Sequence, residues 1–143
     1  MRTTEVLLVD DNPGDTDLTS EILVRSGCHI QSVTDGVEAI AFLRREGKYA
    51  IKVLPDFVIL DLNLPRKDGR AVLAEVKTDP ILREIPITIF STSVAREDVV
   101  RSYRLGANCY VSKPGNLQDY IAAVTAIGEF WFGLARLPHE EQR

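Results

Sequence analysis

Acidic, hydroxyl and ammonium side chains follow four of the apolar segments in this sequence, where they could carry out phosphoryl chemistry. The pairings are Asp10 and Asp11 after residues 6–9, Asp61 after 57–60, Ser91 after 87–90, and Lys113 after 109–112. Short apolar segments that alternate with helical patterns predict parallel, fully buried strands. Because ligands bind at the carboxyl ends of strands in an open α/β sheet, we expect these side chains to meet at one edge.

The three aspartates together predict a divalent-metal site. Asp10, Asp11 and Asp61 would repel one another in a single cleft and resist ionisation unless a cation is present. Mg²⁺ takes oxygen ligands and keeps several water molecules, which leaves room for a phosphoryl substrate. An Asp-Asp pair at a strand end could instead cap a helix or form a turn, but Asp61 at a neighbouring strand end favours the metal.

Asp61 is the candidate nucleophile, because a carboxylate can attack phosphorus and form an acyl phosphate. Lys113 would add positive charge; a surface lysine at a turn is the alternative. Pro114 indicates a tight loop, in which the Lys113–Pro114 bond could be cis. The Ser91 hydroxyl could bond a phosphoryl oxygen or could simply cap the next helix.

Five strand–helix units would position these side chains. The second strand is weak, over residues 29–33, and helices are expected after the caps Asn12, Asp35 and Asp68, over about 96–105, and from Asn116 into 130–132. Gly27 and Gly47 are expected to end the first two helices. The alternation predicts a parallel α/β sheet with right-handed crossovers.

The bulk properties fit one small domain. The chain has 143 residues, 45% of them hydrophobic, and 17 basic against 21 acidic residues give a net charge of −4. The acidic balance argues against nucleic acid as a partner, and no apolar segment approaches the roughly 20 residues of a membrane span. The start shows no signal-peptide pattern, and Cys28 and Cys109 are not spaced as a metal or redox motif. We therefore expect a cytoplasmic protein with two reduced thiols.

Over roughly residues 5–127 the chain resembles the receiver domains of two-component response regulators. The matching motifs are Asp10-Asp11, residues 60–65 with Asp68-Gly69, Ser91, Gly106-Ala107, and residues 110–114. The resemblance implies a flavodoxin-like (βα)5 doubly wound parallel sheet with strand order 2-1-3-4-5. Residues 1–127 would be the receiver domain. Residues 128–143 would be a helical extension and tail, too short for an output domain.

The resemblance also implies a role for each residue that matches the family's motifs. These roles are Asp61 as phosphoacceptor, Mg²⁺ held by Asp10, Asp11, Asp61 and the backbone carbonyl of Asn63, Lys113 neutralising the phosphoryl group, Ser91 as switch hydroxyl, and Tyr110 as the aromatic that turns inward. A sensor histidine kinase would donate the phosphoryl group from its phosphohistidine. The face formed by the fourth helix, fifth strand and fifth helix would then bind a partner. Such a protein is no enzyme beyond its own phosphorylation and dephosphorylation.

A narrower resemblance points to stand-alone regulators that serve phytochrome-type histidine kinases. It rests on residues 11–15, 79–86, 91–93, 108–110 and 129–131. It implies a phytochrome-type kinase as the phosphoryl donor and a downstream phosphotransfer or effector protein as a further partner.

Three other functions remain open from the sequence. A pseudo-receiver would act as an interaction module without phosphate, although the retained Asp61 and Lys113 speak against it. An aspartyl phosphatase would carry a general acid two residues after its nucleophile, where this chain has Asn63. A flavin-binding protein of this fold would need a phosphate-cradling loop after the first strand, and none is visible.

The last helix carries two apolar stripes, which is wider than a surface helix normally buries. We expect a twofold homodimer through this helix and its extension, with contacts from Tyr120, Ile127, Phe130, Trp131 and Phe132. The alternative is that the aromatic residues fold back on their own domain.

Overall fold

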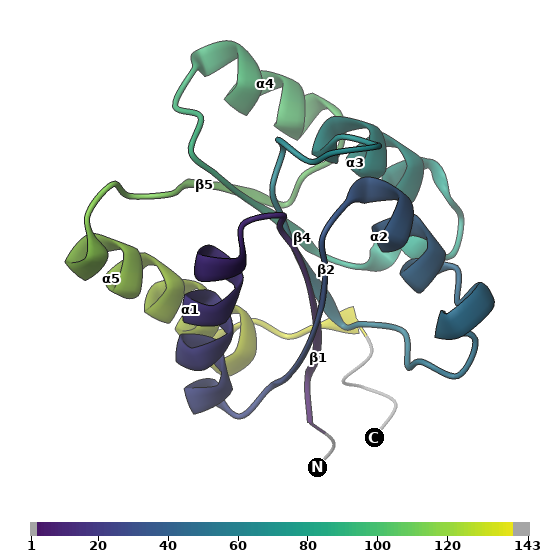
Figure 1. Ribbon diagram of the computed structural model, residues 1–143, viewed down its shortest axis with the longest axis horizontal. Helices are drawn as coiled ribbons and strands as arrows, with labels where there is room; N and C mark the ends of the chain where they lie inside the picture. Colours follow the sequence, from purple (N-terminus) through teal and green to yellow (C-terminus); the bar gives the residue numbers. More distant parts are fainter. Residues whose placement is uncertain (1–2, 139–143) are drawn as a thin grey trace.

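Five parallel strands form the centre of the computed structural model, which describes residues 3–138 (Figure 1). The strands are β1 (Glu5–Val9), β2 (His29–Val33), β3 (Phe57–Leu60), β4 (Ile87–Ser91) and β5 (Cys109–Ser112). They lie in the order β2-β1-β3-β4-β5, and all neighbouring pairs are parallel. The flavodoxin-like order 2-1-3-4-5 is therefore confirmed.

Helices cover both faces of this sheet. They are α1 (Pro13–Leu23), α2 (Gly36–Leu43), α3 (Gly69–Thr78), α4 (Arg96–Arg104) and α5 (Leu117–Gly128). Figure 1 shows α1 and α5 together on one face, with α2, α3 and α4 on the other. No helix within residues 3–138 is both long enough and apolar enough to cross a membrane.

Alternating residues of the central strands supply two separate apolar cores. In β1, Leu7 and Val9 face the core under α2 and α3, whereas Val6 and Leu8 face the core under α1 and α5. Side chains alternate along a strand, so a strand buried on both faces is apolar at most positions. This requirement explains the largely apolar segments that made β1, β3 and β4 visible in the sequence, with Thr88 of β4 as a buried polar exception.

The expected helix starts are confirmed by their capping hydrogen bonds. The capping side chains accept backbone N–H groups three residues ahead: Asn12 from Asp15 at 3.0 Å, Asp35 from Glu38 at 2.8 Å, Asp68 from Ala71 at 3.0 Å and Asn116 from Asp119 at 2.9 Å. Each bond satisfies a backbone donor that the first helical turn leaves unpaired. The sequence therefore located the starts of four helices correctly.

Some boundaries and burial differ from the expectations. The helix α1 ends at Leu23 and tightens into a 3-10 turn, Val24–Ser26, before Gly27 turns the chain at φ +83°. The helix α2 ends at Leu43, ahead of Gly47. The strand β5 is half-buried rather than fully buried, because it lies at an edge of the sheet.

The C-terminal segment folds back on its own domain. After α5 the chain continues as a π-helical segment, η4 (Glu129–Leu134). The rings of Trp131 and Phe132 pack against Phe57 at the start of β3, with centroids 4.9 Å and 5.5 Å apart. Trp131 and Phe132 therefore fold back on their own domain, which was the alternative to a dimer contact.

Two residues that were expected at a dimer contact are buried inside the domain. Tyr120 and Ile127 belong to the core under α1 and α5, and each is only 6% exposed. The Tyr120 hydroxyl hydrogen-bonds Thr19 of α1 at 2.8 Å. Assigning Tyr120 and Ile127 to a second copy was wrong, because α1 already covers this face of α5. Phe130 remains 48% exposed.

Candidate functional site

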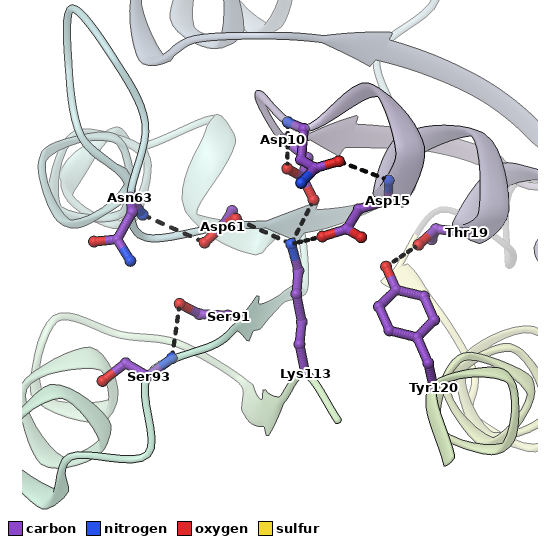
Figure 2. A network of polar contacts seen from close by, with 10 residues as sticks. Asp10, Asp15, Thr19, Asp61, Asn63, Ser91, Ser93, Lys113 and Tyr120 are labelled. Atoms are coloured by element: carbon purple, nitrogen blue, oxygen red, sulfur yellow. Dashed lines mark hydrogen bonds and ion pairs between the residues drawn. The ribbon is translucent and has the colours of Figure 1, made fainter. Parts of the chain in front are cut away.

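The ammonium group of Lys113 lies among three carboxylates at the carboxyl edge of the sheet (Figure 2). Its Nζ donates hydrogen bonds to Asp10 Oδ2 at 2.7 Å, Asp15 Oδ2 at 2.9 Å and Asp61 Oδ2 at 3.1 Å. The Lys113 side chain is only 3% exposed. An ammonium has three protons, so these carboxylates account for its full donor capacity.

Backbone hydrogen bonds of the sheet continue into the site and position its side chains. The N–H of Asp10 donates to the carbonyl of Val33, and the N–H of Asp61 donates to that of Val9. The N–H of Lys113 donates to the carbonyl of Ser91 at 2.7 Å. The site residues therefore lie in register with their neighbours across the sheet.

Asp10, Asp11 and Asp61 form a group that could hold a metal ion. Their carboxylate oxygens all lie within 4.8 Å of one another; Asp10 and Asp61 are buried, and Asp11 is exposed. The second Asp10 oxygen accepts the N–H of Asn12 at 2.9 Å, and the second Asp61 oxygen accepts the N–H of Asn63 at 3.3 Å. An all-oxygen donor set that opens to solvent through Asp11 fits a hard divalent cation such as Mg²⁺.

Burial and neighbouring charges shift the pKa values of Asp10 and Lys113. Burial raises the pKa of Asp10 above its ordinary value, and the hydrogen bond from Lys113 offsets this only in part. Burial alone would lower the pKa of Lys113, but its bonds to Asp10 and Asp15 and the charge of Asp61 outweigh burial and raise it. Lys113 is therefore firmly protonated, and its charge offsets only part of the cost of burying the Asp10 carboxylate.

Asp15 is a site residue that the sequence analysis did not identify. It is an acidic residue in the first turn of α1, and its carboxylate reaches Lys113 from that turn (Figure 2). Its position in the first turn of a helix that begins directly after Asp10 and Asp11 is the signal that could have found it. It shows that α1 contributes chemistry to the site as well as packing.

Gly69 allows α3 to begin directly against the backbone of Asp61. A Cβ atom at Gly69 would lie 2.1 Å from the Asp61 carbonyl oxygen, closer than any real contact. The Gly69 N–H also donates to the Leu62 carbonyl at 2.8 Å. The loop that carries Asp61 and Asn63 is therefore held by a contact that only glycine permits.

Ser91 is fully buried at the end of β4, and its hydroxyl lies at the same edge of the sheet (Figure 2). The backbone N–H of Ser93 points to the Ser91 hydroxyl at 3.5 Å. The cap position of α4 is Ala95, with no side-chain capping bond, so Ser91 is not a helix cap.

Tyr110 on β5 is bonded to the same loop. Its hydroxyl donates to the Ser93 carbonyl at 2.9 Å, and the Ser112 hydroxyl donates to the same oxygen at 3.2 Å. Burial raises the pKa of Tyr110, so the hydroxyl stays protonated and able to donate.

The possible cis bond before Pro114 is absent, because every described peptide bond is trans.

Comparison with known proteins agrees with this geometry. Residues 6–125 match the family model "Response regulator receiver domain". The response regulator Rcp1 from Synechocystis sp. is 42% identical over 135 residues, which cover 93% of this chain and 92% of that protein.

Solved structures give the same result. The phosphorylated cyanobacterial phytochrome response regulator RcpA superposes with a TM-score of 0.93 at 46% identity, covering 96% of this chain and 99% of that one. The Mn²⁺-bound form of Rcp1 gives a TM-score of 0.91 at 42% identity, covering 94% and 99%. Rcp1 therefore provides an example of a divalent ion bound to a chain of this fold.

Proposed function

The chain belongs to the family of response regulator receiver domains, and from this premise we propose that it accepts a phosphoryl group onto Asp61. The donor is the phosphohistidine of a sensor histidine kinase, because a two-component receiver takes its phosphoryl group from such a kinase. The observation that carries the proposal is the convergence of Asp10, Asp11, Asp61 and Lys113 at one edge of the sheet.

Each side chain has a defined part in this transfer. A carboxylate oxygen of Asp61 attacks phosphorus, the phosphorus–nitrogen bond to histidine breaks, and an acyl phosphate forms. Lys113 supplies a positive charge beside the incoming group. Asp10, Asp11, Asp61 and the backbone carbonyl of Asn63 would hold Mg²⁺, which would neutralise charge on the phosphoryl oxygens.

The switch connects Ser91 and Tyr110 through the loop that follows β4. The Ser91 hydroxyl moves to a phosphoryl oxygen, and the loop that carries Ser93 moves with it. The bond between Tyr110 and the Ser93 carbonyl supports this coupling. The result is an altered face of α4, β5 and α5, which binds a downstream phosphotransfer or effector protein.

The kinase that we propose is of the phytochrome type, and the protein works in the cytoplasm. The support is the similarity to RcpA, whose structure is described as that of a phytochrome response regulator, and to Rcp1. The described cysteines, Cys28 and Cys109, are free, which suits a reducing compartment. Phosphotransfer from a purified phytochrome-type kinase, compared with an unrelated histidine kinase, tests this assignment.

Acetyl phosphate with Mg²⁺ tests the phosphoacceptor. Wild-type protein should gain one acid-labile phosphoryl group, and Asp61→Asn should gain none while remaining folded. Stable labelling of the Asp61→Asn variant would place the acceptor elsewhere. A folded wild-type protein that takes no phosphoryl group from acetyl phosphate or any kinase would be a pseudo-receiver.

A twofold homodimer through the C-terminal segment is part of the proposal, although its contact is smaller than the sequence predicted. Phe130 and Leu134 are 48% and 74% exposed, whereas Trp131 and Phe132 are partly covered by their own domain. Sedimentation at micromolar concentration should show a dimer for the wild type and a monomer for Phe130→Glu. Ile51→Glu is the matched control, because Ile51 is 93% exposed and distant in sequence. A wild-type monomer would reject the dimer.

A further inference from the structure

We propose that the Asp15 carboxylate balances the positive charge of Lys113 when a divalent cation binds Asp10 and Asp61. Asp15 thereby sets the affinity of the site for that cation. Asp15 is a positioning residue in this account, acting through Lys113 and not as a metal ligand. The inference rests on the proposed function, because it assigns a regulator of the same metal site.

The first step is a competition that the geometry contains. Lys113 donates hydrogen bonds to Asp10 at 2.7 Å and to Asp61 at 3.1 Å, and these carboxylates belong to the group that could hold a metal. A cation at that group would draw electron density from the carboxylates of Asp10 and Asp61, to which Lys113 also donates. The ammonium and the metal therefore compete for Asp10 and Asp61.

The second step is that Asp15 differs from the other partners of Lys113. It accepts from Nζ at 2.9 Å, but it lies outside the Asp10, Asp11 and Asp61 group whose oxygens are within 4.8 Å of one another. It also comes from α1, whose first turn is fixed by the Asn12 cap on the Asp15 N–H. Its carboxylate can therefore serve Lys113 without withdrawing a ligand from the metal.

The third step is the consequence of removing this partner. In Asp15→Asn the protonated Lys113 loses one charged acceptor and must rely on Asp10 and Asp61 alone. A cation then has to weaken those two bonds while facing an ammonium that nothing else neutralises. Because hydrogen bonds to charged groups are the strong ones, we expect the affinity for Mg²⁺ to fall about tenfold.

Calorimetric titration with MgCl₂ at constant ionic strength measures this effect. The charge-matched control is Asp17→Asn, because Asp17 is an exposed residue of the same helix and makes no bond to Lys113. Asp17→Asn should bind Mg²⁺ like the wild type, and Asp15→Glu should recover part of the lost affinity. Equal affinities of Asp15→Asn and wild type, or equal losses in both Asn variants, would overturn the inference.

A double variant separates action through Lys113 from direct attraction of the cation. In a Lys113→Gln background, with folding checked by circular dichroism, Asp15→Asn should no longer weaken Mg²⁺ binding. An undiminished loss in that background would mean that Asp15 attracts the cation directly, and the inference would be wrong.

A second measurement follows the lysine itself and needs no metal. The protons of the Lys113 ammonium, observed through its side-chain ¹⁵N resonance, should exchange with water faster in Asp15→Asn than in Asp17→Asn. Unchanged exchange would mean that Asp15 does not hold the Lys113 ammonium, and the inference would be wrong.

Failure of the proposed function is distinguishable from failure of this inference. A wild-type protein that binds no Mg²⁺ and takes no phosphoryl group rejects both. A wild type that does both, beside an unchanged Asp15→Asn variant, rejects the inference alone.

Discussion

The hydroxyl of Tyr110 and the backbone carbonyl of Ser93 are joined by a 2.9 Å hydrogen bond that ties β5 to the loop after β4. Ser93 also donates its hydroxyl to Asp98 of α4 at 2.6 Å, and Asp98 accepts from Arg70 of α3 at 2.7 Å. Ser93 thus connects β5, α3 and α4 at a point two residues from Ser91. A displacement of this loop would change the hydrogen bonds that connect it to β5, α3 and α4.

Removing one of the two donors to the Ser93 carbonyl should lower the unfolding free energy only slightly. Removing both should lower it by more than the sum of the two single losses. Tyr110→Phe leaves Ser112 as a donor to the Ser93 carbonyl, so we expect about 0.5–1.5 kcal/mol lower unfolding free energy. The same should hold for Ser112→Ala, and the double variant should show a more than additive loss. Urea unfolding of all four proteins measures the coupling; strict additivity would mean that the two bonds are independent.

Lys113→Ala should destabilise the metal-free protein strongly. The change leaves Asp10 and Asp61 buried without their ammonium, and breaking such a pair typically costs about 3–5 kcal/mol. Added MgCl₂ should restore part of the loss, since the cation replaces the missing charge. Chemical unfolding with and without Mg²⁺ measures both effects, and Lys48→Ala at the surface is the control. Wild-type stability in Lys113→Ala would make Lys113 only a turn residue.

Thr88→Val should stabilise the protein by about 1–2 kcal/mol. Thr88 is fully buried in β4, and its hydroxyl has no hydrogen-bond partner among the described residues. Valine keeps the shape and removes the desolvated hydroxyl. Thr19→Val is the opposite control, because the buried Thr19 hydroxyl is bonded to Tyr120 at 2.8 Å and its loss should destabilise. In thermal unfolding, the melting temperature should rise for Thr88→Val and fall for Thr19→Val.

Cys28 should make stability fall in alkaline solution. Burial raises the pKa of Cys28 from 9.0 to about 11, and its Sγ donates to the Leu23 carbonyl at 3.2 Å. A pKa that is raised in the folded state gives a contribution that is complete below pH 9 and is lost as the pH rises through 11. The loss corresponds to up to about 3 kcal/mol.

Unfolding free energies at pH 8, 9, 10 and 11 test this dependence. The decline should be shallower in Cys28→Ala than in the wild type. Parallel curves for the wild type and Cys28→Ala would mean that other groups cause the alkaline loss.

Local patterns in the sequence located the elements and the edge where the site lies. Largely apolar segments predicted β1, β3 and β4, because strands buried on both faces leave few positions for polar side chains. Asn12, Asp35 and Asp68 predicted helix starts, because capping is a contact between residues three apart. The convergence of Asp10, Asp61 and Lys113 followed from their strand ends, while the roles assigned to them stay predictions.

Contacts between distant segments were decided only by the tertiary structure. The sequence does not show that Asp15 and Lys113 bond across 98 positions, because that contact depends on where the first turn of α1 lies relative to the loop after β5. Nor does an apolar stripe on α5 reveal which partner covers it. Tyr120 is covered by α1, and Trp131, on the π-helical segment η4 that continues α5, packs on Phe57 of β3. Periodicity shows which residues need burial, and only packing in three dimensions determines what buries them.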